Sequence, residues 1–257
     1  MKNIFKTMFP VLIFAAFFLG CSNEDLKPIY GEQVAGKVVI RGYSTLKDSV
    51  QIVSNGKILK IGEKNTFIGK IIKDYEFVYY DNKEKNIDII NKATGEILHS
   101  YNFTASSPND TLSFYVKDGI WLDDVLSFKP GVLSGTGVTG YKFIFPTMNR
   151  YSNSGYDGPI DGIIKKLNGE ILGVAENITK DSFSNFVEFA FAPPPIFTVQ
   201  LVKHGTTDSY IAGQQVVVQM VMQNNKSRMI VLDEKVNENG TFSGVEGIIN
   251  LTDYFDF

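Results

Sequence analysis

The 257-residue chain is poor in the side chains that most often carry chemistry, with one cysteine and two histidines. A single cysteine cannot form an internal disulfide, so the fold must rest on the burial of apolar side chains. The histidines, His99 and His204, stand in no zinc-binding spacing, and no Gly-x-Ser-x-Gly nucleophile motif occurs. We therefore expect no enzyme activity, no catalytic residue, no metal site and no cofactor.

The chain also has no large excess of positive or negative charge. Its formal net charge is −3, and its longest basic run is the pair Lys165-Lys166. Proteins that bind nucleic acids carry basic patches that neutralise phosphates. Nucleic acid is therefore not an expected partner.

Long apolar runs are absent except near the N-terminus, where residues 7–20 are uncharged. This run is shorter than the about 20 apolar residues that a membrane-spanning helix needs. Lys2 and Lys6 precede it, and Gly20-Cys21 ends it, which is the pattern of a secretory signal peptide with a lipobox. The sequence thus predicts a signal peptide over residues 1–20 and lipid attachment at Cys21.

This segment resembles the N-terminus of Bacteroidetes-type surface lipoproteins. The resemblance implies that Cys21 becomes the first residue of the mature chain and carries lipid, palmitate included, followed by a tether over residues 21–30. Several acyl chains would hold the protein firmly on a membrane, at about 0.8 kcal/mol per buried methylene. The acidic pair Glu24-Asp25 resembles the signal that sends such proteins to the outer face of the outer membrane.

The remaining residues show the alternation of a β protein, with turns at Gly, Asn and Asp. Strands recur about every ten residues, a spacing typical of immunoglobulin-like antiparallel β-sandwiches. We predict an all-β fold with two tandem domains of this kind, over residues 31–129 and 130–257, with the boundary at Pro130. The expected strands are 34–41, 49–54, 57–61, 67–72, 75–80, 86–90, 96–103, 111–116, 140–145, 160–166, 170–175, 185–192, 196–203, 214–223, 229–233 and 242–251.

The motif Asn-Gly-x-Ile-Leu occurs twice, beginning at Asn55-Gly56 and at Asn168-Gly169. Asn-Gly favours the type I′ turn of a tight hairpin, because both residues accept a positive φ. Five matching residues at a turn are weak evidence for common descent, so a general resemblance between hairpins is favoured over an internal duplication.

Aromatic residues supply the candidates for a binding face. Tyr151 and Tyr156 lie in a segment rich in Gly, Asn and Ser, the composition of adaptable recognition loops. Trp121 is the sole tryptophan, and either it contacts a ligand or it packs in the core of a sandwich. These three residues are the predicted ligand contacts.

Two functions remain open from the sequence. The first is a cell-surface binding or adhesion module, an accessory in glycan capture. The second is a structural subunit of a cell-envelope assembly with a protein partner. Asp48-Ser49-Val50 and Asp110-Thr111-Leu112 also resemble O-glycosylation sites of secreted Bacteroidetes proteins, which implies sugar attachment at Ser49 and Thr111.

Overall fold

The computed structural model describes residues 32–117 and 119–257. The predicted signal peptide, Cys21 and the tether lie outside the described residues. The described chain is all-β, as predicted, and none of its helices has the length and apolar content required to cross a bilayer. Its elements are β1 (Gln33–Ser44), β2 (Val50–Ser54), β3 (Lys57–Ile58), β4 (Gly69–Tyr80), β5 (Lys85–Asn91), β6 (Ile97–Phe103), β7 (Asn109–Lys117), β8 (Ile120–Asp123), η1 (Val125–Ser127), β9 (Val138–Ile144), β10 (Ile160–Lys166), β11 (Ile171–Ile178), β12 (Val187–Ala190), β13 (Ile196–Lys203), β14 (Val216–Val221), β15 (Lys226–Val236), β16 (Phe242–Asn250) and η2 (Leu251–Asp253).

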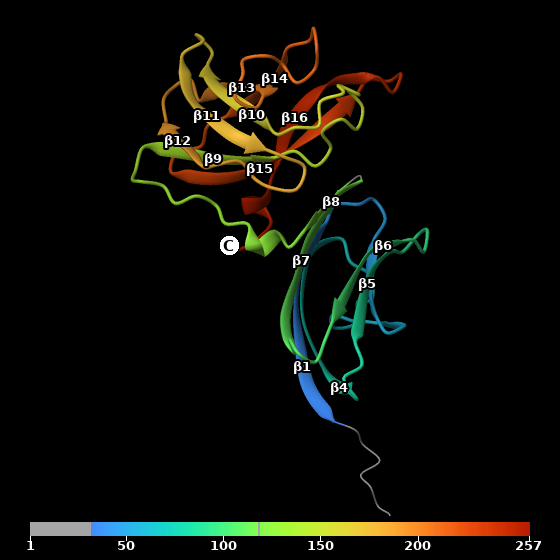
Figure 1. The fold of residues 1–257 in the computed structure, drawn as a ribbon. Coiled ribbons are helices and arrows are strands. Elements are labelled where there is room, and N and C mark those ends of the chain that lie inside the picture. The colour runs from blue at the N-terminus through green and yellow to red at the C-terminus, as the bar shows by residue number, and fades with distance from the viewer. Residues whose placement is uncertain (1–31, 118) are drawn as a thin grey trace, which may run out of the picture.

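The strands form four sheets, two from each half of the chain (Figure 1). In the first half the orders are β4-β1-β7-β8 and β3-β2-β5-β6; in the second they are β12-β9-β15-β16 and β11-β10-β13-β14. The two sandwich-like halves confirm the predicted fold class. Most neighbours are antiparallel, but each half also contains one parallel pair that the sequence did not reveal, β1 with β7 and β9 with β15. The domain boundary at residue 130 stays a prediction.

The two halves share one topology. Adding eight to each strand number of the first half reproduces the sheet orders of the second, and each half ends in a short 3-10 helix, η1 or η2. The Asn55-Gly56 turn joins β2 to β3, and Asn168-Gly169 joins the corresponding strands β10 and β11. This correspondence favours an internal duplication over two unrelated hairpins.

The two turns differ in backbone conformation. Asn55 and Gly56 have φ values of 46° and 77°, as a type I′ turn requires. At the second turn only Gly169 has a positive φ, of 89°. The type I′ expectation therefore holds for the first turn and is wrong for the second.

Two predicted strands, 67–72 and 75–80, are one continuous strand, β4. The sequence Lys73-Asp74 suggested a break, but β4 pairs with β1 along its whole length. Asp74 is held there by ion pairs with Lys37 at 2.9 Å and Arg41 at 3.2 Å, both on β1. Polar residues on the exposed face of a strand are thus compatible with pairing. Strand β8, which carries Trp121, was not predicted from the sequence.

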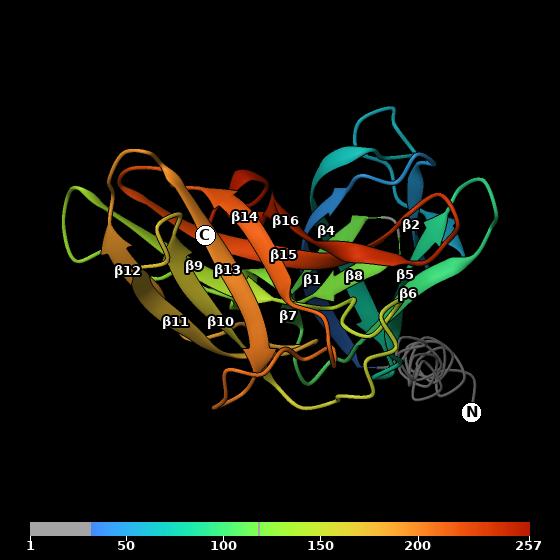
Figure 2. The ribbon, with the colours of Figure 1, turned by 90° about the horizontal axis from the view of Figure 1, so that it is seen from above.

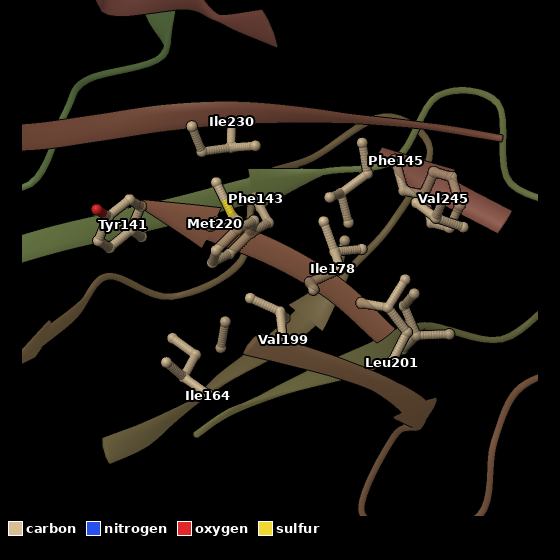
Figure 3. Close-up of a cluster of buried hydrophobic side chains, with 14 of the residues drawn as sticks. Tyr141, Phe143, Phe145, Ile164, Ile178, Val199, Leu201, Met220, Ile230 and Val245 are labelled. Atoms are coloured by element: carbon tan, nitrogen blue, oxygen red, sulfur yellow. The ribbon is translucent and has the colours of Figure 1, made fainter. Parts of the chain in front are cut away.

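Each half has its own core between its two sheets. The larger cluster, in the second half, includes the side chains drawn in Figure 3, such as Tyr141, Phe143, Ile164, Val199 and Met220. The first half buries a smaller set centred on Ile40, Ile52, Ile89 and Phe114. Burial of this kind contributes about 25 cal/mol per Å² of apolar surface, which replaces the stabilisation that disulfides would give.

A third cluster joins the two halves. Its buried members come from both: Tyr115, Ile120, Leu122, Val125, Ile144, Met229, Val231, Ile249, Leu251 and Phe255. Tyr115 lies on β7, whose neighbours Phe114 and Val116 face the core of the first half. Likewise β15 directs Met229 and Val231 into this junction and Ile230 and Leu232 into the second core. The corresponding strands β7 and β15 are therefore buried on both faces, and the halves form one packed body.

Candidate functional site

The segment between β9 and β10, residues 145–159, contains the two predicted ligand-contact tyrosines, and we call it the tyrosine loop. It is fixed at its start by Phe145, whose N–H donates to the carbonyl of Thr179 at 2.8 Å. The hydroxyl of Thr147 donates to Asp233 at 3.1 Å and accepts from the N–H of Glu234 at 2.9 Å. These bonds attach the loop to the end of β15.

The centre of the loop folds around one carboxylate. Glu234 is 1% exposed. Its Oε1 accepts from the N–H of Asn149 at 3.0 Å, the hydroxyl of Ser152 at 2.6 Å and the hydroxyl of Tyr210 at 3.1 Å. Its Oε2 accepts from the N–H groups of Tyr151 at 2.7 Å and Ser152 at 3.0 Å. Converging donors of this kind replace the water that a buried carboxylate would otherwise need.

The hydroxyl of Tyr210 completes this arrangement. Burial, and then the negative charge of Glu234 beside it, raise the pKa of Tyr210. The phenol therefore stays protonated and remains a donor to the carboxylate. The backbone of the tyrosine loop is consequently fixed before any ligand arrives, a condition that lowers the entropy cost of binding.

The two tyrosines of the loop have different surroundings. Tyr151 is half-buried, and the guanidinium carbon of Arg150 lies 5.3 Å from the centroid of its ring. Tyr156 packs against the core of the second half and donates its hydroxyl to the carbonyl of Pro159 at 2.8 Å. Both ligand contacts stay predictions. The side chain of Tyr156 packs on the core and donates a hydrogen bond within the loop, whereas the ring of Tyr151 contacts Arg150.

Trp121 lies on β8 in the first half, where it packs against the core. Its indole is the middle of three stacked rings: the centroids of Phe114 and His99 each lie 5.0 Å from it, at interplanar angles of 7° and 10°. Phe114 is fully buried, whereas His99 lies at the rim. This arrangement agrees with the alternative that Trp121 packs in the core of a sandwich. Its role as a ligand contact stays a prediction.

At the His99 end of this stack lie polar side chains that were not predicted to form a site. Asp123 on β8 lies 3.2 Å from Nε2 of His99 and accepts from the hydroxyl of Tyr101 at 2.5 Å. Burial, followed by the bond to Asp123, raises the pKa of Tyr101, which remains a donor. The group links edge strand β6 of one sheet to edge strand β8 of the other. His99 and Tyr101 are two residues apart on β6 and therefore lie on the same face of the strand, and this spacing was the available signal in the sequence.

Arg150 connects the tyrosine loop to the β7–β8 hairpin, which carries Trp121. Its guanidinium lies against Gly119, in the turn between β7 and β8, at the place where a side chain on Gly119 would stand. Gly119 has a φ of +79°, which favours glycine there for a second reason. The structure thus brings the tyrosine loop next to the hairpin that carries Trp121, although the sequence places these segments in different halves.

A second histidine-carboxylate pair lies in the second half. Asp161, buried on β10, accepts from the N–H groups of Asn177 at 3.0 Å and Gly205 at 2.8 Å, and lies 2.9 Å from Nδ1 of His204. Burial alone would raise the pKa of Asp161, but the bonds from Gly205, His204 and Asn177 outweigh it and lower the pKa. The same hydrogen bond raises the pKa of His204. The pair fixes the turn after β13.

The two predicted O-glycosylation residues lie in the first half. Thr111 is exposed on β7, and Ser49 is half-buried just before β2. Sugar attachment at either residue stays a prediction.

No protein-family model matches the chain, and no curated protein matches it. Among solved structures it is similar to the TIE protein of Bacillus anthracis, at 9% identity and a TM-score of 0.24, over 77% of this chain and 33% of that one. The chain therefore spans about a third of the length of that protein.

Two further similar structures are carbohydrate-binding modules. One comes from work on alpha-glucan recognition by family 41 modules of streptococcal virulence factors, at 12% identity and a TM-score of 0.23, over 76% of this chain and 92% of that one. The other is a family 26 module from Eubacterium rectale in complex with maltoheptaose, at 14% identity and a TM-score of 0.22, over 82% and 93%. At these TM-scores the similarities carry no argument about this chain.

Proposed function

We propose that this protein is a lipid-anchored binding module of the outer membrane, exposed on the cell exterior, that captures glycans through the tyrosine loop. The observation that carries the proposal is the loop held on Glu234: three backbone N–H groups, of Asn149, Tyr151 and Ser152, are fixed by one buried carboxylate. A fixed loop that offers a tyrosine ring beside polar side chains suits a sugar, which needs an apolar face and hydrogen-bonding groups together.

The neighbouring side chains give this surface its chemistry. Arg150 and Tyr151 are in cation-π contact, and Asn153 and Asp157 are exposed on the same loop. Amide and carboxylate groups can pair with sugar hydroxyls, while the ring of Tyr151 can stack on a pyranose face. The proposal assigns no catalytic role to these groups.

A glycan array with the chain from Ser22 onward tests this function. All described strands lie within this chain, so it contains every core of the fold. We expect binding to at least one class of polysaccharide, with loss of the signal in Tyr151→Ala. The absence of any signal across common neutral and acidic glycans would remove glycan capture from the account.

The second candidate, a structural subunit of an envelope assembly, has one observation in its favour. Leu167 and Val221 are 58% and 60% exposed, and a groove of about 370 Å³ beside them is lined by Leu167, Pro193, Pro194 and Met222. Exposed apolar side chains around a groove are typical of protein contacts. Concentration-dependent self-association or partner capture that is lost in Leu167→Ser would favour this candidate.

A further inference from the structure

The first half carries a lysine-rich segment that the predicted function does not use. Between residues 57 and 73 the chain has five lysines, Lys57, Lys60, Lys64, Lys70 and Lys73, and one acidic residue, Glu63, which gives a net charge of +4. The whole chain has a net charge of −3. Positive charge is therefore concentrated in this segment, which comprises β3, the loop after it and the start of β4.

Most of these lysines lack acidic partners among the described residues. Within residues 32–117 and 119–257, Lys70 is the only one of the five that forms an ion pair, with Asp256 at 2.8 Å. Lys57, Lys60 and Lys64 are exposed. A group of cations that does not neutralise the protein's own carboxylates is available to an anionic partner.

Isoleucines lie among the lysines. A groove of about 360 Å³ is lined by Ile61, Lys64, Thr66, Phe67, Ile68, Lys70 and Ile72. Ile68 is 63% exposed and Ile72 is 48% exposed, whereas Phe67 is buried. The accessible apolar groups are thus aliphatic. Aliphatic side chains beside lysines suit the boundary between lipid headgroups and acyl chains, whereas sugars are usually held by accessible aromatic rings.

From these observations we infer that the surface of Lys57, Lys60, Lys64, Ile68 and Ile72 docks on an anionic lipid bilayer. The alternative partner, a second copy of the chain that pairs with edge strand β4, is less favoured. Lys73 pairs with Ile40, whose side chain is fully buried, so Lys73 lies on the core-facing side of this edge strand. An inward-facing lysine on an edge strand opposes edge-to-edge pairing.

The position of the surface suits a tethered protein. Gly69 pairs with Ser44, at the end of β1 opposite Gln33, so the groove lies about 36 Å along the sheet from the first strand residue. Gln33 lies twelve positions after Cys21, a stretch of chain that can span about 40 Å. A chain anchored at Cys21 can therefore place this surface on the same membrane.

Such docking would leave the tyrosine loop facing away from the membrane. In Figure 2 the segment between β2 and β4 (cyan) and the loop that follows β9 (yellow) lie at opposite margins of the molecule. The inference does not depend on glycan binding, and its test uses an unlipidated chain, so the two can fail separately.

The test is co-sedimentation of the unlipidated chain from Ser22 with vesicles of phosphatidylcholine and phosphatidylglycerol in equal parts, and with phosphatidylcholine vesicles alone. We expect binding to the anionic vesicles only, weakened by salt. The double variant Lys60→Gln/Lys64→Gln should bind about thirtyfold more weakly, because each lysine near an anionic surface contributes about 1 kcal/mol. The matched control Lys83→Gln/Lys180→Gln removes two exposed lysines from elsewhere and should bind as the wild type does.

Ile68→Asn separates a bilayer from an anionic polysaccharide. It should weaken vesicle binding and leave any binding to soluble polygalacturonate unchanged, because only the bilayer offers an apolar layer. The inference is overturned if anionic vesicles are not bound, if the control pair loses as much affinity as Lys60→Gln/Lys64→Gln, or if polygalacturonate binds in place of vesicles. Circular dichroism should show the same fold in all variants, since the substituted side chains are exposed.

Discussion

Replacing the buried carboxylate with an amide, in Glu234→Gln, tests what fixes the tyrosine loop. The amide nitrogen must take the place of either Oε1 or Oε2. At the Oε2 position it would face two backbone donors, Tyr151 N–H and Ser152 N–H. At the Oε1 position it would face one backbone donor, Asn149 N–H, and two hydroxyls that can turn and accept. We therefore expect the nitrogen at Oε1, with the Asn149 N–H left unpaired.

The magnitude follows from that geometry. An unpaired buried donor costs about 1 to 3 kcal/mol, and the remaining bonds lose the strength that a charged acceptor gives. Glu234→Gln should therefore lower the free energy of unfolding by about 3 kcal/mol, measured by urea denaturation. Amide hydrogen exchange should accelerate most at Asn149 and less at Tyr151 and Ser152. The exposed Glu238→Gln is the matched control and should change stability by less than about 0.5 kcal/mol.

Two results would refute this reasoning. If Glu234→Gln unfolds at the same urea concentration as Glu238→Gln, the carboxylate does not hold the loop. If the exchange rate at Asn149 stays at the wild-type value, the predicted orientation of the amide is wrong.

The other predictions concern the junction, the histidine pair and the anchor. Met229→Ala should lower the free energy of unfolding by about 2 to 5 kcal/mol in one urea transition, because Met229 is fully buried between the halves; a loss no larger than that of exposed Ile248→Ala would contradict it. The hydrogen bond to Asp161 raises the pKa of His204, so the pair stabilises the fold fully below the unfolded-state pKa of about 6.5, and this stabilisation is lost as the pH rises through the raised pKa. The wild type should therefore lose stability relative to His204→Gln as the pH rises above about 6.5; parallel pH profiles would exclude this. Cys21→Ala should abolish fatty-acid labelling and leave an uncleaved precursor, and labelling that persists would remove the anchor.

The strands could be predicted because apolar and polar residues alternate plainly along them. The surface that covers the outer face of a strand could not be predicted. Phe114 to Val116 and Met229 to Leu232 are continuous apolar runs in the sequence, and both were predicted only to be strands. A strand buried on both faces has this pattern. Periodicity alone does not say which surface covers the second face, so the junction between the halves became visible only in the structure.

The candidate site was partly predictable for a related reason. Composition identified the tyrosine loop. The carboxylate that holds the loop, Glu234, lies 82 to 85 residues away in the sequence from its hydrogen-bond partners in that loop. A charged Asp233-Glu234 pair inside an apolar strand was the available signal. The lysines between residues 57 and 73 are spaced too widely to form a basic run in the sequence.

The most direct measurement of the central claim is the affinity of Tyr151→Ala for the glycan that the wild-type chain binds, by isothermal titration calorimetry. We expect a loss of about 2 kcal/mol, roughly thirtyfold in affinity, because a contact aromatic is removed from a loop whose backbone stays fixed on Glu234. Tyr80→Ala, at an exposed tyrosine of β4, is the control and should bind as the wild type does. Equal affinity of Tyr151→Ala and wild type, with both proteins folded, would contradict the account.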